Sequence, residues 1–327
     1  MEAADNGRQS LEQGTQTPDR ATLIAFLAAS VIGGTNFVAV KYSNDELEPM
    51  WGAALRFTLA ALILLGINRA LRLSVPRGRA AMGGIVYGAL GFGVSYAGLY
   101  IALVGLSPGV ASVLVAATPL FTLGLAVAHR QERFSVRGLI GSLLVLVGIG
   151  VLSSGSLGGD IEFRYLLASL IGVLAIAESS VLIKGYPRLH PVTTNAVGMG
   201  TGAAVLALAS LVAGETWALP ATGRTWFVLA WLVAAGSVGL FVLFLFVIGR
   251  WTASASVYAV TLMPVVAVGL SALLGQEELT LGLILGGCLV ISAVYIGALS
   301  GARKPTVTET PDPAVMAGEA VQPTATR

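Results

Sequence analysis

The feature that most constrains the fold is a set of long apolar runs without charge. Between Arg79 and Arg130 the chain has no Lys, Arg, Asp or Glu, and a second run from Thr225 to Leu274 carries only Arg250. A soluble globular protein has about a quarter of its residues charged. This chain has 11% charged and 55% hydrophobic residues and a mean hydropathy of +0.83. We therefore expect a protein that is solvated by lipid.

Runs of about 20 mostly apolar residues are long enough to cross a hydrocarbon core of about 30 Å as helices. The two longest runs each exceed one span, so we divide the first near Pro108 and Gly109 and the second at Arg250. The sequence then predicts an all-α integral membrane protein with ten transmembrane helices, at residues 21–40, 50–68, 81–102, 108–128, 137–153, 165–185, 192–212, 225–248, 254–274 and 281–299.

The loops test this number of spans, because Lys and Arg collect in the cytoplasmic connections of membrane proteins. With the N-terminus inside, only Lys41, Arg164 and Arg224 fall on the outer side. An error of one span would exchange alternate loops and remove the asymmetry, so we expect a multi-pass protein of the cell membrane with both termini in the cytoplasm. The cytoplasmic side then holds Arg8, Arg20, Arg69, Arg72, Arg77, Arg79, Arg130, Arg133, Arg137, Lys184, Arg188, Arg250, Arg303, Lys304 and Arg327.

The chain ends and the composition exclude several kinds of partner and site. Residues 1–20 form a polar tail without the basic start of a cleavable signal peptide, and residues 301–327, rich in Pro, Thr, Ala and Glu, are typical of a disordered tail. The net charge of +2 is too small and too scattered for a nucleic-acid surface. One cysteine, Cys288, and two histidines cannot form a thiolate cluster or a three-histidine site, so we expect no nucleic-acid partner and no metal.

The chain also matches itself when it is displaced from Pro119 to Pro264. The segment PLFTLGLAVAHRQERFSVRGLIG lies over PVVAVGLSALLGQEELTLGLILG, and a Pro, a Gln-Glu pair and two Gly residues coincide without gaps. Apolar composition explains shared Leu or Val more easily than shared residues of these kinds. We therefore expect two repeats, 21–153 and 164–300, joined by an external linker at 154–163.

Each expected repeat holds five spans, and this odd number places the second repeat in the membrane in the opposite sense to the first. Inverted repeats form two bundles that rock about a site at their interface, which is the usual construction of alternating-access carriers. Duplication that only produced a stable bundle is the alternative. The GxxxxGK[ST] motif of ATP-binding loops is absent, so we expect no cofactor and a carrier driven by substrate or proton gradients.

Several segments resemble the EamA-type branch of the drug/metabolite transporter superfamily. They are GGTNFVAVKY (Gly33 to Tyr42), PMWGAALRF (Pro49 to Phe57) and the two helices that end in HRQERFS and GQEELT. The resemblance covers about residues 21 to 300. It implies a ten-helix carrier of small metabolites, often an exporter of amino acids or related compounds. The cargo, the direction of flux, the coupling ion and the oligomeric state, including a homodimer, stay open.

Glu178 is the one carboxylate that the sequence places deep inside a span. A carboxylate in the membrane costs several kcal/mol unless it is paired, hydrated or protonated, so its default interpretation is functional. We expect it to face the central cavity and to bind a proton or an ammonium group of the cargo. The alternative is a structural carboxylate, bonded to neighbouring helices or neutralised by Arg56. The equivalent residues of the first repeat are Thr35 and Asn36, and Asn36 joins the candidate site.

Arg56 is the one basic residue well inside a span. Its side chain could snorkel outward, bind a cargo carboxylate, pair with Glu178, or have a structural or gating role. We favour the structural or gating role, because an Arg-Phe pair recurs at this point in similar proteins whatever the cargo. Pro119 and Pro264 lie near the middle of their spans, where a missing N–H and a ring clash bend a helix and free carbonyl groups. We assign them a structural or gating role and leave contact of their freed carbonyls with cargo open.

The remaining site candidates are neutral hydrogen-bonding groups and a deep aromatic ring, which suit a small polar or amphipathic cargo. They are Tyr96, Thr118, Ser256, Tyr258 and Thr261. The competing functions are a passive channel or uniport facilitator, a scaffold, and an intramembrane hydrolase or lipid-modifying enzyme that uses Glu178 and a serine. The enzyme lacks a histidine base within a span and a second deep carboxylate, so the sequence favours a carrier that is not an enzyme.

Overall fold

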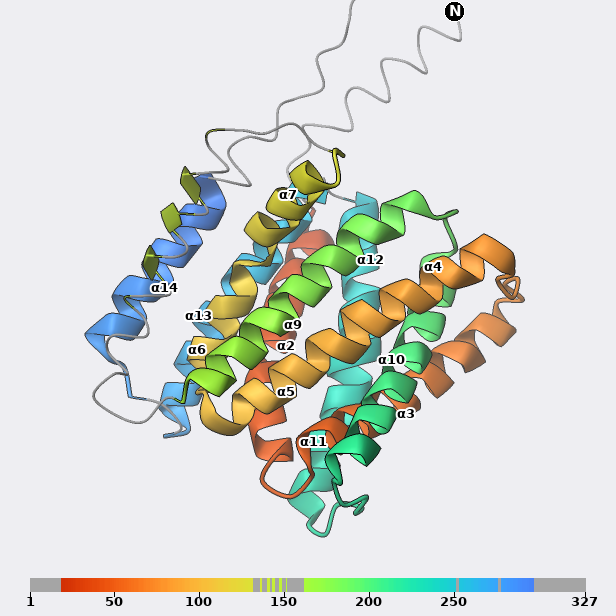
Figure 1. The fold of residues 1–327 in the computed structure, drawn as a ribbon, viewed down its shortest axis with the longest axis horizontal. Helices are drawn as coiled ribbons and strands as arrows, with labels where there is room; N and C mark the ends of the chain where they lie inside the picture. Colours follow the sequence, from red (N-terminus) through yellow and green to blue (C-terminus); the bar gives the residue numbers. More distant parts are fainter. Residues whose placement is uncertain are drawn as a thin grey trace, which may run out of the picture.

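The computed structural model describes residues 19–131, 136, 140–141, 143–144, 147–148, 151, 162–250, 253–275 and 278–296, without the side chains of 245, 248–250, 253–261 and 294. Secondary structure in this part of the chain is helical, and Figure 1 shows the helices packed side by side. Seven helical segments of the described part are long and apolar enough to cross a membrane: Arg20–Ser43, Pro49–Ala70, Gly78–Gly105, Pro108–Ala128, Phe163–Gly185, Pro191–Ala213 and Gly223–Phe244. The protein is therefore an all-α, multi-pass membrane protein.

The helices of the first part of the chain occupy the first four expected spans. They are α2 (Arg20–Ser43), α3 (Pro49–Ala70), α4 (Gly78–Gly88), η1 (Ala89–Val94), α5 (Ser95–Gly105), α6 (Pro108–Ala116) and α7 (Thr118–Ala128). The fifth expected span, at 137–153, lies mostly outside the described residues. The number of ten spans therefore stays a prediction.

The helices of the second part occupy the last five expected spans. They are α9 (Phe163–Leu182), η2 (Ile183–Gly185), α10 (Pro191–Ala213), α11 (Gly223–Val233), η3 (Ala234–Gly239), α12 (Leu240–Arg250), α13 (Ala253–Leu273) and α14 (Leu281–Val294). The expected tail at 301–327 lies outside the described residues, as does most of the tail at 1–20.

Helix starts follow local sequence signals. Pro49, Pro108 and Pro191 each stand at the start of a helix, where the N–H that proline lacks would have no partner within the helix. The side chains of Asp19 and Thr222 accept hydrogen bonds from backbone N–H groups three residues later, which satisfies donors that the first helical turn leaves open.

The contacts between helix ends show how the chain crosses the bundle. Lys41, near the end of α2, donates from Nζ to the carbonyl oxygens of Val104 at 2.9 Å and Leu106 at 3.4 Å, which lie where α5 ends. Gly105 in turn packs against the ring of Tyr165, near the start of α9. Helix α2 therefore ends, and helix α9 begins, at the same end of the bundle.

Packing between the two parts of the chain is reciprocal. Helix α2 packs against α11, α12 and α13, whereas α9 packs against α5, η1 and α7, and α3 lies along α10. Glycines permit the close approach. A Cβ on Gly88 would overlap the carbonyl group of Gly198, and a Cβ on Gly98 would overlap the carbonyl oxygen of Ala168.

Two six-residue π-helical segments interrupt corresponding spans. The segment η1 (Ala89–Val94) lies between α4 and α5, and η3 (Ala234–Gly239) lies between α11 and α12, 145 residues later at both ends. Short π-helical segments inside α-helices are rare in proteins overall. Where they do occur, they often lie at functional sites, because the wider turn rearranges the backbone hydrogen bonds. The same uncommon backbone feature thus recurs at the displacement that the sequence match predicts.

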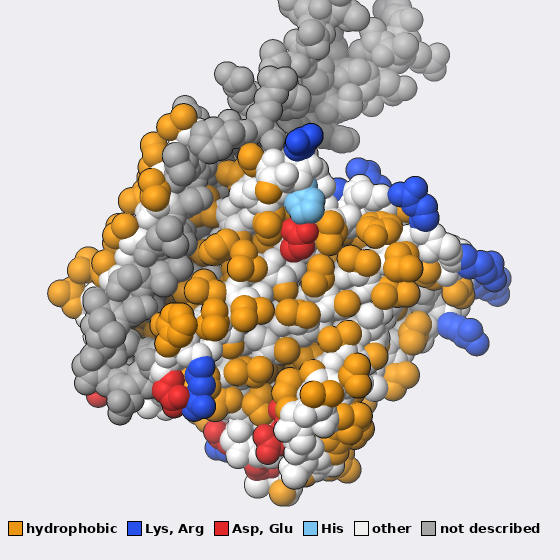
Figure 2. Space-filling view, viewed as in Figure 1, with side chains coloured by type: hydrophobic (Ala, Val, Ile, Leu, Met, Phe, Trp, Pro, Cys, Tyr) orange, Lys and Arg blue, Asp and Glu red, His pale blue; other side chains and the backbone are white. Residues whose placement is uncertain are grey.

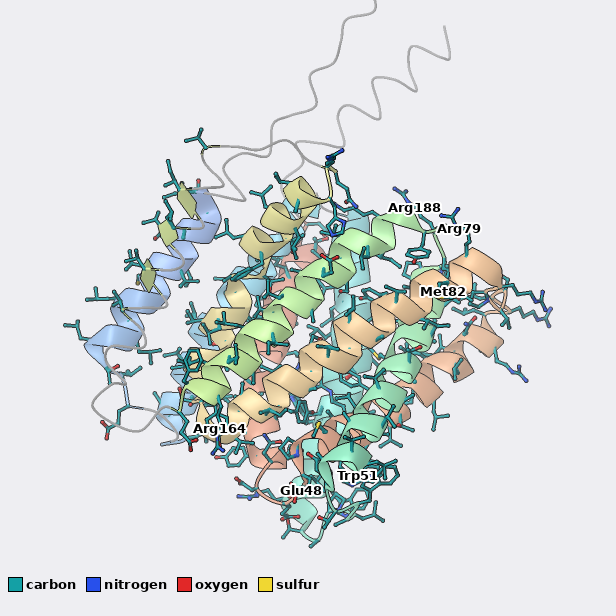
Figure 3. All side chains as sticks on the ribbon, viewed as in Figure 1. Glu48, Trp51, Arg79, Met82, Arg164 and Arg188 are labelled. Atoms are coloured by element: carbon teal, nitrogen blue, oxygen red, sulfur yellow. The ribbon has the colours of Figure 1, made fainter. Side chains whose placement is uncertain are left out.

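The surface divides into an apolar middle and two polar ends. Figure 2 shows hydrophobic side chains over the middle of this face, with Lys and Arg side chains mainly along its upper and right edges. Figure 3 labels Arg79 and Arg188 at that edge, while Arg164, Glu48 and Trp51 lie at the lower edge. An apolar belt of this kind matches the solvent that a bilayer provides.

Candidate functional site

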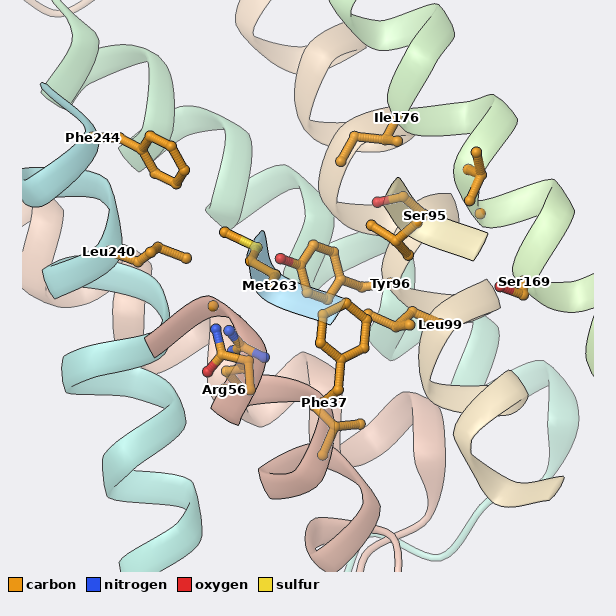
Figure 4. Close-up of a pocket in the computed structure, with 16 residues that line it drawn as sticks. Phe37, Arg56, Ser95, Tyr96, Leu99, Ser169, Ile176, Leu240, Phe244 and Met263 are labelled. Carbon is orange, nitrogen blue, oxygen red and sulfur yellow. The ribbon is translucent and has the colours of Figure 1, made fainter. Parts of the chain in front are cut away.

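A cavity of about 230 Å³ lies between the two parts of the chain (Figure 4). Helices from both sides line it. The first part supplies Gly33, Asn36, Phe37, Val40, Arg56, Ser95, Tyr96, Leu99 and Val115. The second part supplies Ser169, Gly172, Val173, Ile176, Leu240, Phe244 and Met263.

Arg56 is the one charged residue among the lining residues that the structure describes, and only 1% of it is exposed. Its Nε donates to Ser237 Oγ at 2.9 Å, its Nη2 donates to the Gly236 carbonyl oxygen at 3.1 Å, and its Nη1 lies 3.5 Å from the Tyr100 hydroxyl. Two of these partners come from η3, on the other side of the cavity from α3. The guanidinium therefore joins the two parts of the chain.

The π-helical segment η3 provides the backbone for this contact. The Ser237 hydroxyl donates to the carbonyl oxygen of Leu232 at 3.0 Å, five residues earlier, and its oxygen accepts from Arg56. The carbonyl oxygen of Gly236 accepts from Arg56 and also from Asn36 Nδ2 at 3.2 Å. Position 236 needs glycine, because a Cβ there would overlap the Asn36 amide.

Asn36 therefore contributes to the cavity as the sequence predicts, although its first partner is the protein backbone. Its amide nitrogen binds the Gly236 carbonyl, and its Oδ1 atom is buried without a hydrogen-bond partner in the described part of the chain. Most buried polar atoms in proteins are hydrogen-bonded, so a buried acceptor without a partner on a residue that lines the cavity is unusual.

Tyr96 also lines the cavity, and its ring forms part of an aromatic group around Arg56. The Tyr96 and Phe57 rings meet edge to face with centroids 4.6 Å apart. The guanidinium carbon of Arg56 lies 5.1 Å from the Phe57 centroid and 5.4 Å from the Tyr96 centroid. Aromatic faces stabilise a nearby cation but carry no net charge to neutralise it.

Glu178 lies away from this cavity. Ser169, Val173 and Ile176 recur at helical spacing along the lining face of α9, and Glu178 follows Ile176 by two residues, about 200° around the helix. Its Oε1 is 2.8 Å from His129 Nε2, at the end of α7, and the two side chains are 26% and 38% exposed. The structure thus joins Glu178 to His129, which sequence analysis had placed at a helix end, and does not join it to Arg56.

Thr118 and Pro119 lie at a break in their span. Helix α6 ends at Ala116 and α7 begins at Thr118, so the interruption expected near Pro119 is present. Pro119 has no N–H for the Val115 carbonyl oxygen four residues earlier, and the Thr118 hydroxyl donates to that oxygen at 2.6 Å. Thr118 therefore satisfies its own helix and is not among the described residues that line the cavity.

Pro264 lies within α13, which continues from Ala253 to Leu273 as one helix. Its neighbour Met263 lines the cavity. The other candidates on this helix, Ser256, Tyr258 and Thr261, have side chains outside the described residues.

The sequence interpretation missed Gly236 and Ser237, which hold the charged group of the cavity. One signal was present: Ala89-Leu90-Gly91 and Ala234-Ala235-Gly236 lie at the displacement of the repeat. Nothing in single-sequence periodicity distinguishes a π-helical turn from an α-helical one, so the partners of Arg56 needed the three-dimensional structure.

Comparison with known proteins agrees with this architecture. The sequence pattern of the EamA-like transporter family matches residues 20–154 and again residues 163–298. The uncharacterized inner membrane transporter YedA of Escherichia coli strain K12 is 28% identical over 261 residues, which cover 78% of this chain and 83% of YedA. A probable amino-acid metabolite efflux pump of Salmonella typhimurium is 32% identical over 135 residues, 41% of this chain and 43% of that protein. A solved crystal structure at 21% identity has a TM-score of 0.61 and covers 87% of this chain and 98% of that one, which shows a shared fold.

The apolar helices and these relatives define a multi-pass membrane transporter of small molecules. The chain belongs to the EamA-like transporter family, within the drug/metabolite transporter superfamily.

Proposed function

We propose that the protein is a secondary carrier that exports a small metabolite by alternating access. The cargo site is the cavity that Arg56, Asn36 and Tyr96 line, and the moving parts are two inverted repeats, 21–153 and 164–300. Both termini lie in the cytoplasm. The printed name of the Salmonella relative, an efflux pump for amino-acid metabolites, supports export and a metabolite cargo.

The observation that carries the proposal is the reciprocal contact around η1 and η3. Asn36 of α2 meets Gly236 of η3, and Ser179 of α9 meets Gly91 of η1. Each first helix thus meets the π-helical segment of the other repeat, as a pseudo-two-fold axis requires. Two nearly equivalent sets of contacts of this kind allow one set to open as the other closes.

We assign proton coupling, if the carrier uses it, to Glu178 and His129. Their contact joins α9 of one repeat to the end of α7 of the other. Ionisable side chains within membrane-spanning helices often mark proton pathways, so a contact of this kind between the repeats can couple protonation to their separation.

Counterflow in proteoliposomes tests the carrier. Vesicles with the purified full chain are loaded with unlabelled water-soluble metabolite extract and diluted into a uniformly ¹³C-labelled extract. A carrier accumulates its labelled cargo transiently above equilibrium, because exchange requires an alternating site. A channel or facilitator without that site only equilibrates the label, and a scaffold leaves it outside.

A matched pair of variants ties counterflow to the cavity. Leu240→Trp fills part of the cavity with a larger side chain, whereas Leu62→Trp makes the same change at a residue that is 60% exposed. We expect the first variant to lose counterflow and the second to keep it. Equal counterflow in both would place the cargo path elsewhere.

A further inference from the structure

The charge in the cavity has no counter-ion among the residues that the structure describes. None of the carboxylates in the described part of the chain forms an ion pair with Arg56, and Glu178 pairs with His129. The partners of Arg56 are a hydroxyl, a carbonyl, a phenol and two aromatic faces. Buried charges in proteins are normally paired, so an uncompensated guanidinium that borders a cavity favours an anion in that cavity.

The guanidinium also keeps donors for that anion. Arginine has five N–H donors, and the described contacts of Arg56 use one on each of its three nitrogens. One N–H remains on each terminal nitrogen. A carboxylate can accept from both terminal nitrogens of a guanidinium at once in bidentate binding.

The rest of the lining limits what can carry the carboxylate. Around the guanidinium the cavity presents Phe37, Leu240, Phe244 and Met263, and its volume of about 230 Å³ is small beside the 300–1,000 Å³ of ordinary ligand sites. No acidic residue of the described lining offers a partner for an ammonium group. The body of the ligand is therefore compact and apolar.

Asn36 adds one requirement for the ligand, a hydrogen-bond donor beside its carboxylate. Its amide nitrogen and Arg56 bind the same carbonyl oxygen, that of Gly236, so its open Oδ1 acceptor lies beside the guanidinium. A hydroxyl or N–H group next to the ligand carboxylate would satisfy that acceptor.

We propose that the cargo is a compact monocarboxylate with an apolar body and a hydrogen-bond donor beside the carboxylate, and that Arg56 binds the carboxylate. This inference rests on the proposed function, since it names the substrate class of the same cavity. It also revises the structural or gating role that the sequence favours for Arg56.

Binding to the purified full chain in detergent tests it with four probes of one shape: 2-hydroxy-4-methylpentanoate, 4-methylpentanoate, 4-methylpentanamide and 4-methylpentylamine. Isothermal titration and thermal unfolding both report binding, because a ligand of the folded state raises its melting temperature. We expect the hydroxy acid to bind most tightly and the plain acid at least threefold more weakly. The amide and the amine should bind at least tenfold more weakly than the hydroxy acid.

Arg56→Met separates a binding role from a structural one. The Gly236 carbonyl keeps Asn36 as a donor, and the Ser237 hydroxyl keeps its bond to Leu232, so the fold retains these partners without Arg56. The expected protein melts no lower than wild type and binds the two acids at least tenfold more weakly. A structural Arg56 predicts a lower melting temperature and, in the protein that folds, unchanged binding.

Asn36→Asp provides a second variant if Arg56→Met fails to fold. It replaces the amide that donates to the Gly236 carbonyl with a carboxylate beside the guanidinium. The charge pair with Arg56 should offset the lost hydrogen bond and exclude the acid probes. The proposal is overturned if the amine binds wild type as tightly as the acids, if neither acid binds, or if Asn36→Asp binds them unchanged. Acid binding without counterflow would reject the carrier but keep this site, and counterflow of neutral or cationic cargo alone would do the reverse.

Discussion

The two sides of the cavity share a backbone plan but differ in chemistry. Both carry a π-helical segment at corresponding positions, and the glycines Gly91 and Gly236 occupy the same place within them. The first side supplies Arg56, Asn36, Ser95 and Tyr96 to the lining, whereas the second supplies one hydroxyl and otherwise apolar residues. The two sides therefore share a backbone feature, while the polar residues of the proposed cargo site come mainly from one of them.

The difference extends to packing. At the displacement of the repeat, Gly98 corresponds to Leu243 and Gly88 corresponds to Val233. The first-repeat positions are glycines because α4 and α5 lie against the backbone of α10 and α9, and a larger residue does not fit there. The corresponding positions of the two parts of the chain therefore differ in residue size, with glycine in the first part where the second has Leu243 and Val233.

Gly98→Ala should have the largest effect, which is a loss of stability of the folded protein. The new Cβ would overlap the Ala168 carbonyl oxygen and lie 3.0 Å from Gly172 Cα, and backbone atoms cannot rotate away. Overpacking costs about 1–3 kcal/mol and sometimes more, and we expect the upper end or loss of folded protein. Gly124→Ala is the control, because no atom lies within 4 Å of its added Cβ. Size-exclusion profiles and melting temperatures in detergent measure both, and equal values would contradict the close packing.

Sequence reasoning predicted the architecture better than the site. Helix positions follow from apolar run length and from prolines such as Pro49 and Pro108, both of which are local properties of the chain. Asn36, Tyr96 and Arg56 were also recognised as candidates from polarity and depth. The sequence does not predict how these three residues are arranged, because the hydrogen-bond partner of Asn36 is 200 residues away in the chain.

Glu178 illustrates the limit most clearly. Its depth in a span predicts a position at the cavity. Which neighbour the side chain contacts, however, depends on its angle around α9 and on where the neighbouring helices lie. The ion pair with His129 depends on where α7 ends relative to α9. A sequence without its fold contains no such information.

Ser237→Ala should have the next largest effect, on the side of the cavity that supports Arg56. The change removes the acceptor for Arg56 Nε and leaves that N–H of a buried cation without a partner, which costs about 1–3 kcal/mol. Ser169→Ala is the matched control, because the buried Ser169 hydroxyl has no partner in the described part of the chain. We expect Ser169→Ala to melt at or slightly above the wild-type temperature. Ser237→Ala at the wild-type temperature would reject the contact.

Glu178→Gln should alter transport more than stability. The pair with His129 is partly exposed, and pairs of that kind contribute about 0–1 kcal/mol. We expect a nearly unchanged melting temperature, unchanged binding of acid probes in the cavity, and counterflow that is reduced or no longer depends on pH. His129→Gln should change the pH profile in the same way. Wild-type rate and pH profile in Glu178→Gln would remove the proposed proton site.

The smallest effect is expected where the two parts of the chain meet near the Asp45–Arg224 ion pair. There the Glu46 carboxylate accepts from the Thr222 hydroxyl and from the backbone N–H groups of Thr222 and Ala221. The Thr222 hydroxyl is the main cause that lowers the pKa of Glu46 below its ordinary value of 4.5, against an opposing effect of burial. A lowered pKa in the folded state means that this contact stabilises the protein above pH 4.5, and that the contribution is lost as the pH falls through the lowered value.

Thr222→Val isolates that contribution. The variant removes the hydroxyl donor and keeps both backbone donors, so the pKa of Glu46 should rise toward 4.5, and the variant should lose less stability than wild type as the pH falls below 4.5. The measurement is the melting temperature of both proteins between pH 3 and pH 7, with Thr194→Val as the control, because the Thr194 hydroxyl binds only within its own helix end. At neutral pH Thr222→Val should also lose the N-cap of α11, which costs about 1 kcal/mol and shifts the whole curve without changing its dependence on pH. Acid curves that run parallel for Thr222→Val and wild type would mean that the Thr222 hydroxyl does not hold the two repeats together through Glu46.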